Sequence, residues 1–440
     1  MRESDIHFQS RFIRWTERFF SQYEVGGGSS RIVPMEGLRG LAVLLVFFVH
    51  FDALFAHNLR GGSWLHGVFH FLGVIGNTGV DLFFVMSGYL IYGALIRREV
   101  GYGKFTRRRV ERIYPTFLVV FVIYLTLSAL FPAENKIHGS FLTASRYVLA
   151  NLFLLPGIFA IKPIVTVAWS LSYEFLFYLT IPLLIGAARM RRWKCEYRLA
   201  AFVFLWVLIG VMLLMQANDN RSRMIAFVVG IILFEVVNES KGGWLLHRVG
   251  EFCTIAMVLA AWWFYYHVRV VRPQSLVDPL FSLCLLSAAF FFFSFYSFQF
   301  DGPLQTVFSW APIRYLGNMS YSYYLIHGLT LEGLAIVFVA LRLPTSSPYI
   351  VLLALLVGFA ATWVTSSALF FLVERKYSLK PRKSMESRSV PEALASSTRE
   401  TAESNLVQDS IRVNLLPLER EANANDSANK FVFPLKKRNG

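Results

Sequence analysis

Charged residues are scarce in this chain. Only 16% of its 440 residues are Asp, Glu, Lys or Arg, whereas ordinary globular chains carry about a quarter. Together with an apolar share of 55%, this scarcity argues against the two or three soluble domains that the length alone would suggest. Apolar segments of about twenty residues recur between positions 36 and 373, and each can cross a hydrocarbon core of ~30 Å. The sequence therefore predicts an all-α, polytopic membrane protein.

Cysteine is also rare, and its three positions, 195, 253 and 284, are scattered. This spacing supports neither a disulfide framework nor a metal knuckle, so we expect no metal site. A basic soluble domain is missing as well, which argues against nucleic acid as a partner. The net charge of +15 belongs mostly to loops and ends. It suits an anionic inner leaflet and would also suit an anionic cytosolic ligand.

The apolar runs predict about ten transmembrane helices. The segments 97–112, 189–194 and 374–383 are strongly basic, whereas the loops on the other side are poor in Lys and Arg. The positive-inside rule then places both termini in the cytoplasm. The expected spans are 36–56, 76–96, 112–132, 166–188, 198–216, 223–238, 251–268, 277–298, 315–341 and 348–373.

Two segments fit this topology less simply. The loop 267–275 carries two arginines, Arg269 and Arg272, on the expected outer side, against the rule. Residues 146–161 are apolar but short and end in Pro156-Gly157, which favours a re-entrant or interfacial segment over a span.

The chain divides into three parts by composition. Residues 1–33 alternate aromatic and arginine residues at helical spacing, which predicts a cytoplasmic amphipathic helix on the membrane surface; a docking site for a partner is the alternative. Residues 34–377 form the membrane domain. Residues 378–440 are polar, and we expect a disordered cytoplasmic tail. No cleavage site follows the first apolar run, so we do not expect it to be a removed signal peptide.

The first span, MEGLRGLAVLLVFFVHFDAL, carries two ionisable residues, Arg39 and His50. A charge near the middle of the bilayer costs several kcal/mol, so such residues are functional candidates. Eleven positions separate the two, which is about three helical turns or roughly 16 Å. Both side chains are therefore expected on one face of the helix.

Other spans carry polar residues at similar depth, namely Asp81, Ser87, Glu174 and His327. Each has a structural interpretation too. Asp81 can serve a helix terminus, Ser87-Gly88 can permit close packing, and His327 can be a strut between helices. Glu174 is hardest to explain in this way, because a carboxylate deep in a span must be paired or protonated.

Arg109 and Arg112 stand three positions apart at the start of a span, in RRRVER. Such arginines are usually positive-inside anchors. Their i, i+3 spacing on one helical face would also suit a grip on phosphate groups.

Five motifs together resemble the bacterial acyltransferase-3 family of integral-membrane O-acyltransferases. In chain order they are RGLAVLLVFFVH, FFVMSGYLI, RRVERIYP, AWSLSYEFLFYL and SYSYYLIHG, and the resemblance covers about residues 34–377. Members of that family acylate, usually acetylate, hydroxyl groups of polysaccharides, lipopolysaccharide O-antigens, peptidoglycan or small molecules at the bacterial cell membrane. Their donor is cytosolic acyl-CoA, and no permanently bound cofactor is implied.

The resemblance assigns roles residue by residue. Arg39, Arg109 and Arg112 would bind acyl-CoA, and His50 would be the general base with Glu174 as its orienting carboxylate. Supporting residues or oxyanion donors would be Ser87, Tyr173, His327 and Asp81. The family's late tyrosine-rich helix matches Tyr321, Tyr324 and His327. One departure is that Glu374 is followed by Arg375-Lys376 where the family usually has a proline two residues after the glutamate.

The residues imply a route for the donor. With its phosphates held at the cytoplasmic face, the pantetheine arm would run along the first helix and present the thioester near His50. The acceptor would be a glycan or another molecule with a hydroxyl group. The acyl group would reach it directly or through an acyl-His or acyl-Ser intermediate. A separate extracytoplasmic transferase could act as a partner in this transfer. The alternatives from other classes are a transporter or flippase, which also buries ionisable groups, and a scaffold protein that docks partners through its ends.

Overall fold

The computed structural model describes residues 22–24, 32–59, 64–131, 136–137, 139–214, 220–239, 247–270 and 277–379. Helices dominate these residues, and the β-structure among them is one isolated bridge between Pro156 and Phe159. The expected amphipathic helix near the N-terminus and nearly all of the expected C-terminal tail lie outside the described residues.

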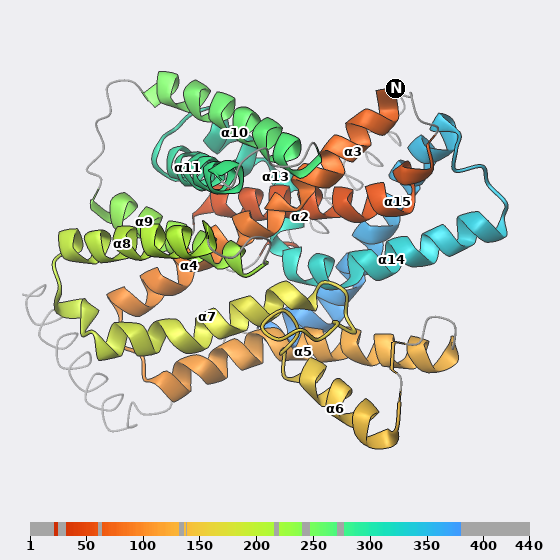
Figure 1. Cartoon of the computed structure of the whole chain (residues 1–440), viewed down its shortest axis with the longest axis horizontal. Coiled ribbons are helices and arrows are strands. Elements are labelled where there is room, and N and C mark those ends of the chain that lie inside the picture. The colour runs from red at the N-terminus through yellow and green to blue at the C-terminus, as the bar shows by residue number, and fades with distance from the viewer. Residues whose placement is uncertain are drawn as a thin grey trace, which may run out of the picture. The chain divides into compact units, whose positions relative to one another are not determined.

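The elements follow one another along the chain as helices joined by short loops (Figure 1). Their bounds are α2 Val33–Leu54, α3 Trp64–Gly76, α4 Thr78–Arg97, α5 Tyr102–Leu130, α6 Phe141–Leu152, α7 Ala168–Ala187, α8 Cys195–Leu214, α9 Ile225–Glu239, α10 His247–Val270, α11 Val277–Gln299, α12 Pro303–Ser309, α13 Ala311–Asn318, α14 Ser320–Ala340 and α15 Pro348–Leu369. Three 3-10 turns, η1 Ala56–Asn58, η3 Met190–Arg192 and η4 Asn220–Met224, and the π-helix η5 Phe370–Ser378 complete the set.

Within the described residues, 9 helices are long and apolar enough to cross a membrane. They confirm the polytopic helical fold and correspond to nine of the ten expected spans. The tenth corresponds to α9, which has 15 residues and a length of about 22 Å. The segment expected to be re-entrant forms α6, of 12 residues, and the loop after it, so it is too short to span.

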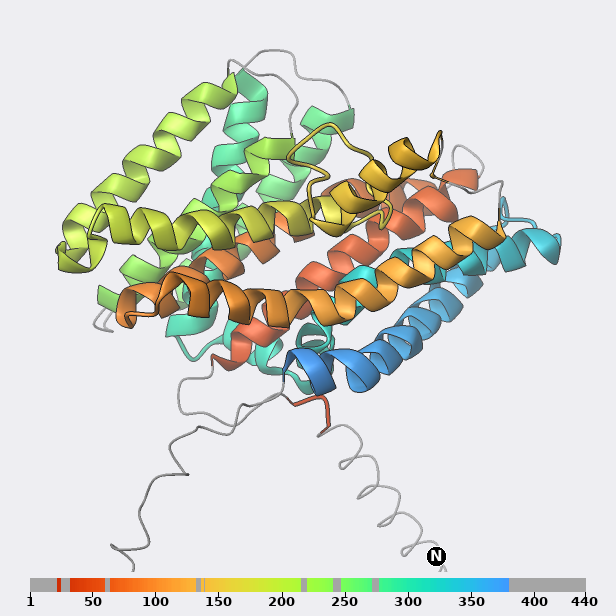
Figure 2. The same cartoon turned by 90° about the horizontal axis from the view of Figure 1, so that it is seen from below.

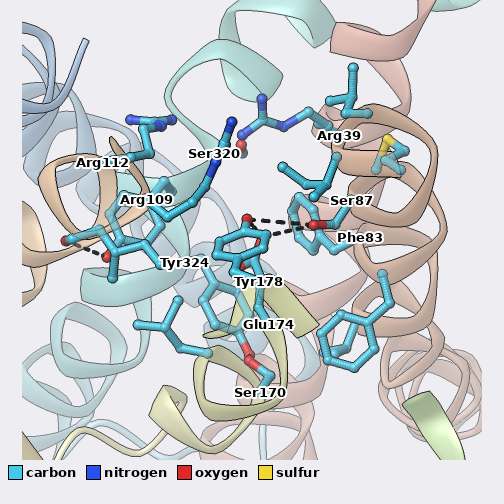
Figure 3. Close-up of a pocket in the computed structure, with 18 of the residues that line it drawn as sticks. Arg39, Phe83, Ser87, Arg109, Arg112, Ser170, Glu174, Tyr178, Ser320 and Tyr324 are labelled. Atoms are coloured by element: carbon cyan, nitrogen blue, oxygen red, sulfur yellow. Dashed lines mark hydrogen bonds between the residues drawn. The ribbon is translucent and has the colours of Figure 1, made fainter. Parts of the chain in front are cut away.

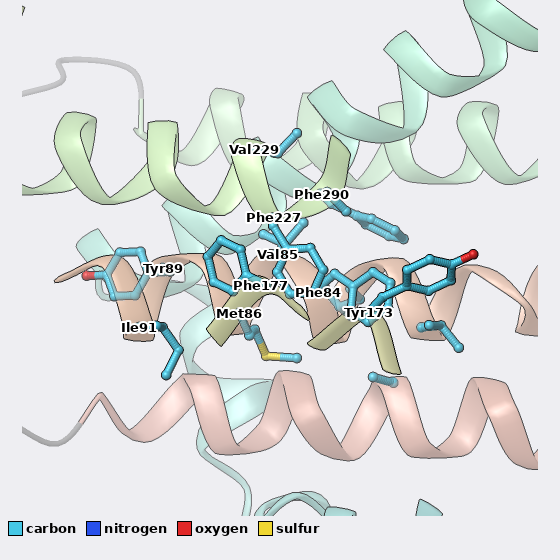
Figure 4. Close-up of a cluster of buried hydrophobic side chains, with 14 of the residues drawn as sticks. Phe84, Val85, Met86, Tyr89, Ile91, Tyr173, Phe177, Phe227, Val229 and Phe290 are labelled. Atoms are coloured by element: carbon cyan, nitrogen blue, oxygen red, sulfur yellow. The ribbon is translucent and has the colours of Figure 1, made fainter. Parts of the chain in front are cut away.

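The most extensive contact between helices joins α4 and α9, and it depends on glycine. A Cβ on Gly88 would lie 2.2 Å from the carbonyl oxygen of Phe227, and one on Gly230 would lie 2.0 Å from that of Val85. Lipid supplies no hydrophobic force that drives membrane helices together, so their association depends on close van der Waals packing. Small residues at the interface allow the backbones to approach this closely. Figure 4 shows the aromatic cluster beside this contact, in which Phe227 stacks between Phe84 and Phe177.

Helix α2 lies at the centre of the fold. It packs against α3, α4, α13, α12 and α14, and α14 in turn contacts α5 (Figures 1 and 2). The π-helix η5 packs against α5, which also contacts α7. Five helices, α2, α4, α5, α7 and α14, thereby come together around one interior space, although they are far apart in sequence.

Candidate functional site

A cavity of about 410 Å³ opens among these five helices. Apolar side chains of α4 line much of it, and polar groups gather along its length. Figure 3 shows Arg39 and Arg112 toward one end, Ser170 at the other, and Ser87, Tyr178 and Glu174 between them. The polar lining residues are Arg39, Ser87, Arg109, Arg112, Ser170, Glu174, Tyr178, Ser320, Tyr321 and Tyr324.

Three guanidinium groups reach the cavity, Arg39 from α2 and Arg109 and Arg112 from α5. Arg112 pairs with Glu374, at 2.8 Å from Nη1 to Oε1. Arg39 and Arg109 take part in none of the ion pairs found among the described residues. Arg109 instead lies over the ring of Tyr178, with 5.4 Å from its guanidinium carbon to the ring centroid. These arginines thus face the interior of the bundle, and within the described part of the chain two of them have no carboxylate as an ion-pair partner.

Glu374 is a functional candidate that sequence reasoning undervalued. Its carboxylate is fully buried, and besides Arg112 it accepts hydrogen bonds from the backbone N–H and hydroxyl of Ser322, at 3.0 and 2.5 Å. It lies in the π-helix η5, a helix type that occurs frequently at functional sites. A carboxylate close to the end of a span was the available signal.

Glu174 occupies the middle of the cavity and is the sole carboxylate among the described lining residues. Its Oε1 accepts a hydrogen bond from the Ser87 hydroxyl at 3.1 Å and another from the Tyr178 hydroxyl. Sequence reasoning missed Tyr178, although its i+4 spacing from Glu174 on α7 places the two on one face. Both hydroxyl protons are directed at the carboxylate in this arrangement.

The far end of the cavity is closed by Ser170 and Tyr324. Their hydroxyl oxygens lie 2.6 Å apart, so one hydroxyl donates to the other, and the carbonyl oxygen of Val167 lies 3.1 Å from Ser170 Oγ and 3.3 Å from the Tyr324 hydroxyl as the acceptor for the remaining proton. Tyr173, expected as a supporting residue, is directed elsewhere: its hydroxyl donates to the carbonyl oxygen of Gly157 at 2.6 Å, in the loop after α6. It is not among the residues that line the cavity.

His50 lies beyond the cavity and close to His327. Their ring centroids are 4.9 Å apart, and neither residue lines the cavity. Tyr324 links the two regions, since it lines the cavity and its ring centroid is 6.0 Å from that of His327. The expected pairing of Glu174 with His50 is not found among the described contacts; the Glu174 carboxylate accepts hydrogen bonds from Ser87 and Tyr178.

Asp81 also lies outside the cavity lining. It stands in the first turn of α4 and pairs with Arg223, at 3.2 Å from Oδ2 to Nη1. Arg223 donates to the carbonyl oxygen of Asn77 at 2.8 Å and lies over the ring of Trp169. This geometry matches the helix-terminus interpretation of Asp81, with Arg223 as a partner that the sequence did not indicate.

Comparison with known proteins adds to this geometry. Residues 33–367 match the family described as Acyltransferase domain, the acyltransferase-3 model. The chain is similar to acyltransferase MdmB of Streptomyces mycarofaciens, at 29% identity over 69% of this chain and 79% of that protein. It is also similar to O-acetyltransferase OatA of Staphylococcus aureus, at 28% identity over 47% of this chain and 35% of that protein.

A further similarity is to peptidoglycan O-acetyltransferase OatA of Listeria monocytogenes, at 24% identity over 68% of this chain and 49% of that protein. The match therefore spans about half the length of that relative and about a third of the staphylococcal one. No solved structure matches the chain significantly.

Proposed function

Since the chain belongs to the acyltransferase-3 family, we propose that it is a membrane O-acyltransferase. It moves an acyl group, acetyl in the simplest case, from cytosolic acyl-CoA to a hydroxyl of a cell-envelope or exported glycan. The observation that carries this proposal is the cavity, which is lined by three arginines, of which Arg39 and Arg109 take part in no ion pair among the described residues. The name of the listerial relative, peptidoglycan O-acetyltransferase, supports a glycan acceptor.

The donor fits the charge of the cavity. Coenzyme A is a polyanion at its nucleotide end, and guanidinium groups bind phosphate through paired, charge-assisted hydrogen bonds. We assign Arg39, Arg109 and Arg112 to these phosphates. The thin pantetheine arm then follows the apolar wall of α4 past Ser87 and Glu174 toward Tyr324.

The reaction joins the acceptor oxygen to the acyl carbon. A base takes the hydroxyl proton as the oxygen attacks the thioester, the carbon–sulfur bond breaks, and the departing thiolate receives a proton to leave as the free thiol of CoA. We assign the base to His50, since a neutral imidazole suits proton transfer near neutral pH. In this assignment Glu174 holds the hydroxyls of Ser87 and Tyr178 along the path of the donor.

The acceptor approaches from the opposite side of the membrane. The site belongs to a multi-pass protein of the bacterial cell membrane with both termini in the cytoplasm, so that the arginine end of the cavity faces the cytosol. Tyr324 and Ser170 then stand between the donor cavity and His50, and their hydroxyl contact opens when the thioester passes.

Turnover of acyl-CoA by the purified protein in lipid nanodiscs tests the proposal. Free thiol release and labelled acetyl transfer are measured for wild type, His50→Ala and the double variant Arg109→Ala/Arg112→Ala. The matched control is Arg107→Ala/Arg108→Ala on the same helix, since Arg107 is exposed and pairs with Glu111.

We expect turnover in wild type and the control, its loss in His50→Ala, and weaker donor binding in the Arg109/Arg112 variant. A folded wild type that neither binds acyl-CoA nor releases thiol in the presence of glycan acceptors contradicts the proposal and favours a transporter. Turnover that persists in His50→Ala keeps the enzyme and removes His50 as the base.

A further inference from the structure

In the described structure one ring nitrogen of His327 is hydrogen-bonded and the other has no hydrogen-bond partner. Its Nδ1 lies 2.9 Å from the carbonyl oxygens of both Tyr323 and Tyr324. A carbonyl oxygen only accepts, so the Nδ1 atom carries the proton. The Nε2 atom of the neutral ring is then an acceptor, and it has no hydrogen-bond partner among the described residues.

This acceptor is completely enclosed. His327 has 0% of its surface exposed, and a buried polar atom without a partner is rare in a folded protein. The hydroxyl groups nearest in sequence are engaged elsewhere: Tyr323 contacts the Thr362 hydroxyl at 2.8 Å, and Tyr324 contacts Ser170. Neither of them supplies the missing donor.

His50 is the polar group that faces His327. The two rings are nearly perpendicular, at 75°, with centroids 4.9 Å apart. Gly328 of α14 lies beside the His50 ring, since a Cβ there would be in ordinary van der Waals contact, at 3.9 Å, with both Nδ1 and Cε1 of His50. The His50 ring is thus close enough for its N–H group to be a candidate donor to Nε2 of His327.

We propose that His327 is the positioning residue of His50. Its fixed Nε2 accepts the N–H of His50 and thereby selects the tautomer in which the other nitrogen of His50 is unprotonated and ready to take the acceptor's proton. This inference rests on the proposed function and gives His327 the part that an orienting carboxylate has in a catalytic triad. Glu174 forms no hydrogen bond or ion pair with His50 among the described contacts, and it lines the cavity whereas His50 does not.

The experiment is a functional double-mutant cycle in nanodiscs. The variants are His50→Ala, His327→Ala, their double, and His327→Gln, whose amide oxygen replaces the Nε2 acceptor. We expect His327→Ala to lower kcat by about 10–100-fold with the KM for acetyl-CoA unchanged. The double variant should be no slower than His50→Ala, and His327→Gln should recover a substantial part of the lost kcat.

The matched control is Thr330→Val on the same helix, which removes the 2.9 Å hydroxyl contact with Thr365 that links α14 to α15. It should keep kcat near wild type. If His327 is only a strut between helices, the opposite pattern is expected. The losses in kcat then add in the double variant, Thr330→Val loses a comparable part of kcat, and His327→Gln recovers none. That pattern, or wild-type kcat in His327→Ala, overturns the inference.

Failure of the proposed function looks different. In that case the wild-type protein itself shows no acyl transfer, whereas failure of this inference alone leaves an active wild type with an unresponsive His327.

Discussion

Two buried clusters of arginine and glutamate in this bundle serve different purposes. In the first, which joins α4, α8 and α9, Glu235 is fully buried and accepts hydrogen bonds from Arg198 at 2.6 and 2.9 Å. The hydroxyl of Tyr92 and the thiol of Cys195 bind the same carboxylate. Every charge there has its counterpart, so the cluster holds three helices together and offers nothing to a ligand.

The second cluster is the arginine end of the cavity, and its charges do not balance. Glu374 accounts for Arg112, while Arg39 and Arg109 are without a carboxylate within ion-pair distance among the described residues. Excess positive charge inside a membrane bundle is unfavourable unless something anionic compensates it. An arginine that faces a cavity without an ion-pair partner is therefore a better candidate for a ligand contact than a buried arginine whose charge is paired.

The largest expected effect comes from breaking the balanced cluster. Glu235→Ala leaves Arg198 without its carboxylate, and removing one partner of a buried ion pair costs about 3–5 kcal/mol of stability. We expect a clearly lower Tm of the protein in nanodiscs, with the affinity of the folded fraction for CoA unchanged. A Glu235→Ala variant that keeps its Tm but loses CoA binding would show that the donor binds at the Glu235 cluster and not at the cavity.

Removal of Arg39 and Arg109 should have the opposite effect, namely weaker CoA binding without a loss of stability. In Arg39→Ala/Arg109→Ala we expect CoA to bind more weakly by about 3 kcal/mol, roughly a hundredfold, because two charge-assisted contacts are lost. The Tm should stay the same or rise, since like charges no longer face one another. Isothermal titration calorimetry with CoA and a thermal melt of the same sample check both halves, and unchanged affinity would contradict the donor site.

Substitution of Glu374 should affect both the stability of the protein and its affinity for CoA. Glu374→Gln removes the charge that holds Arg112 and weakens the contact with Ser322, so we expect a loss of about 1–3 kcal/mol in stability. Donor affinity should change as well, because Arg112 is released from its fixed position. Calorimetry separates the two, and a variant with wild-type affinity would show that Arg112 needs no orienting carboxylate.

The smallest effect is expected on the exposed face of α5. Arg107 pairs with Glu111 at 2.8 Å, with 68% of its side chain exposed, and an exposed i, i+4 pair contributes about 0.3–0.5 kcal/mol. Arg107→Ala should therefore change neither the Tm nor the CoA affinity measurably. A marked loss of CoA binding would extend the phosphate site to the surface of the protein.

Sequence reasoning identified several residues that the structure brings to one cavity: Arg39, Ser87, Arg109, Arg112 and Glu174. Each stands out because an ionisable or hydroxyl group in an apolar span is costly and therefore conspicuous. Their catalytic and binding roles stay predictions. Tyr324 was indicated only by the family resemblance and Tyr178 was missed, because a tyrosine in an aromatic-rich span does not differ locally from one that only packs.

The choice of partners could not be predicted in the same way. The expected carboxylate for His50 was Glu174, yet Glu174 binds Ser87 and Tyr178 while His50 faces His327. Asp81 and Arg223 show the same limit, since they lie far apart in sequence and meet only where η4 returns to the start of α4.

The sequence by itself determined the membrane class, the helical spans and the residues that do not belong in lipid. These features are local, because the length and polarity of a segment decide whether it crosses a bilayer. Tertiary structure alone decided which polar groups meet, which arginines stay uncompensated and which histidine faces which. Those outcomes depend on close approaches such as that of Gly88 and Gly230, which set the rotation and depth of each helix against its neighbours and have no signature within a single span.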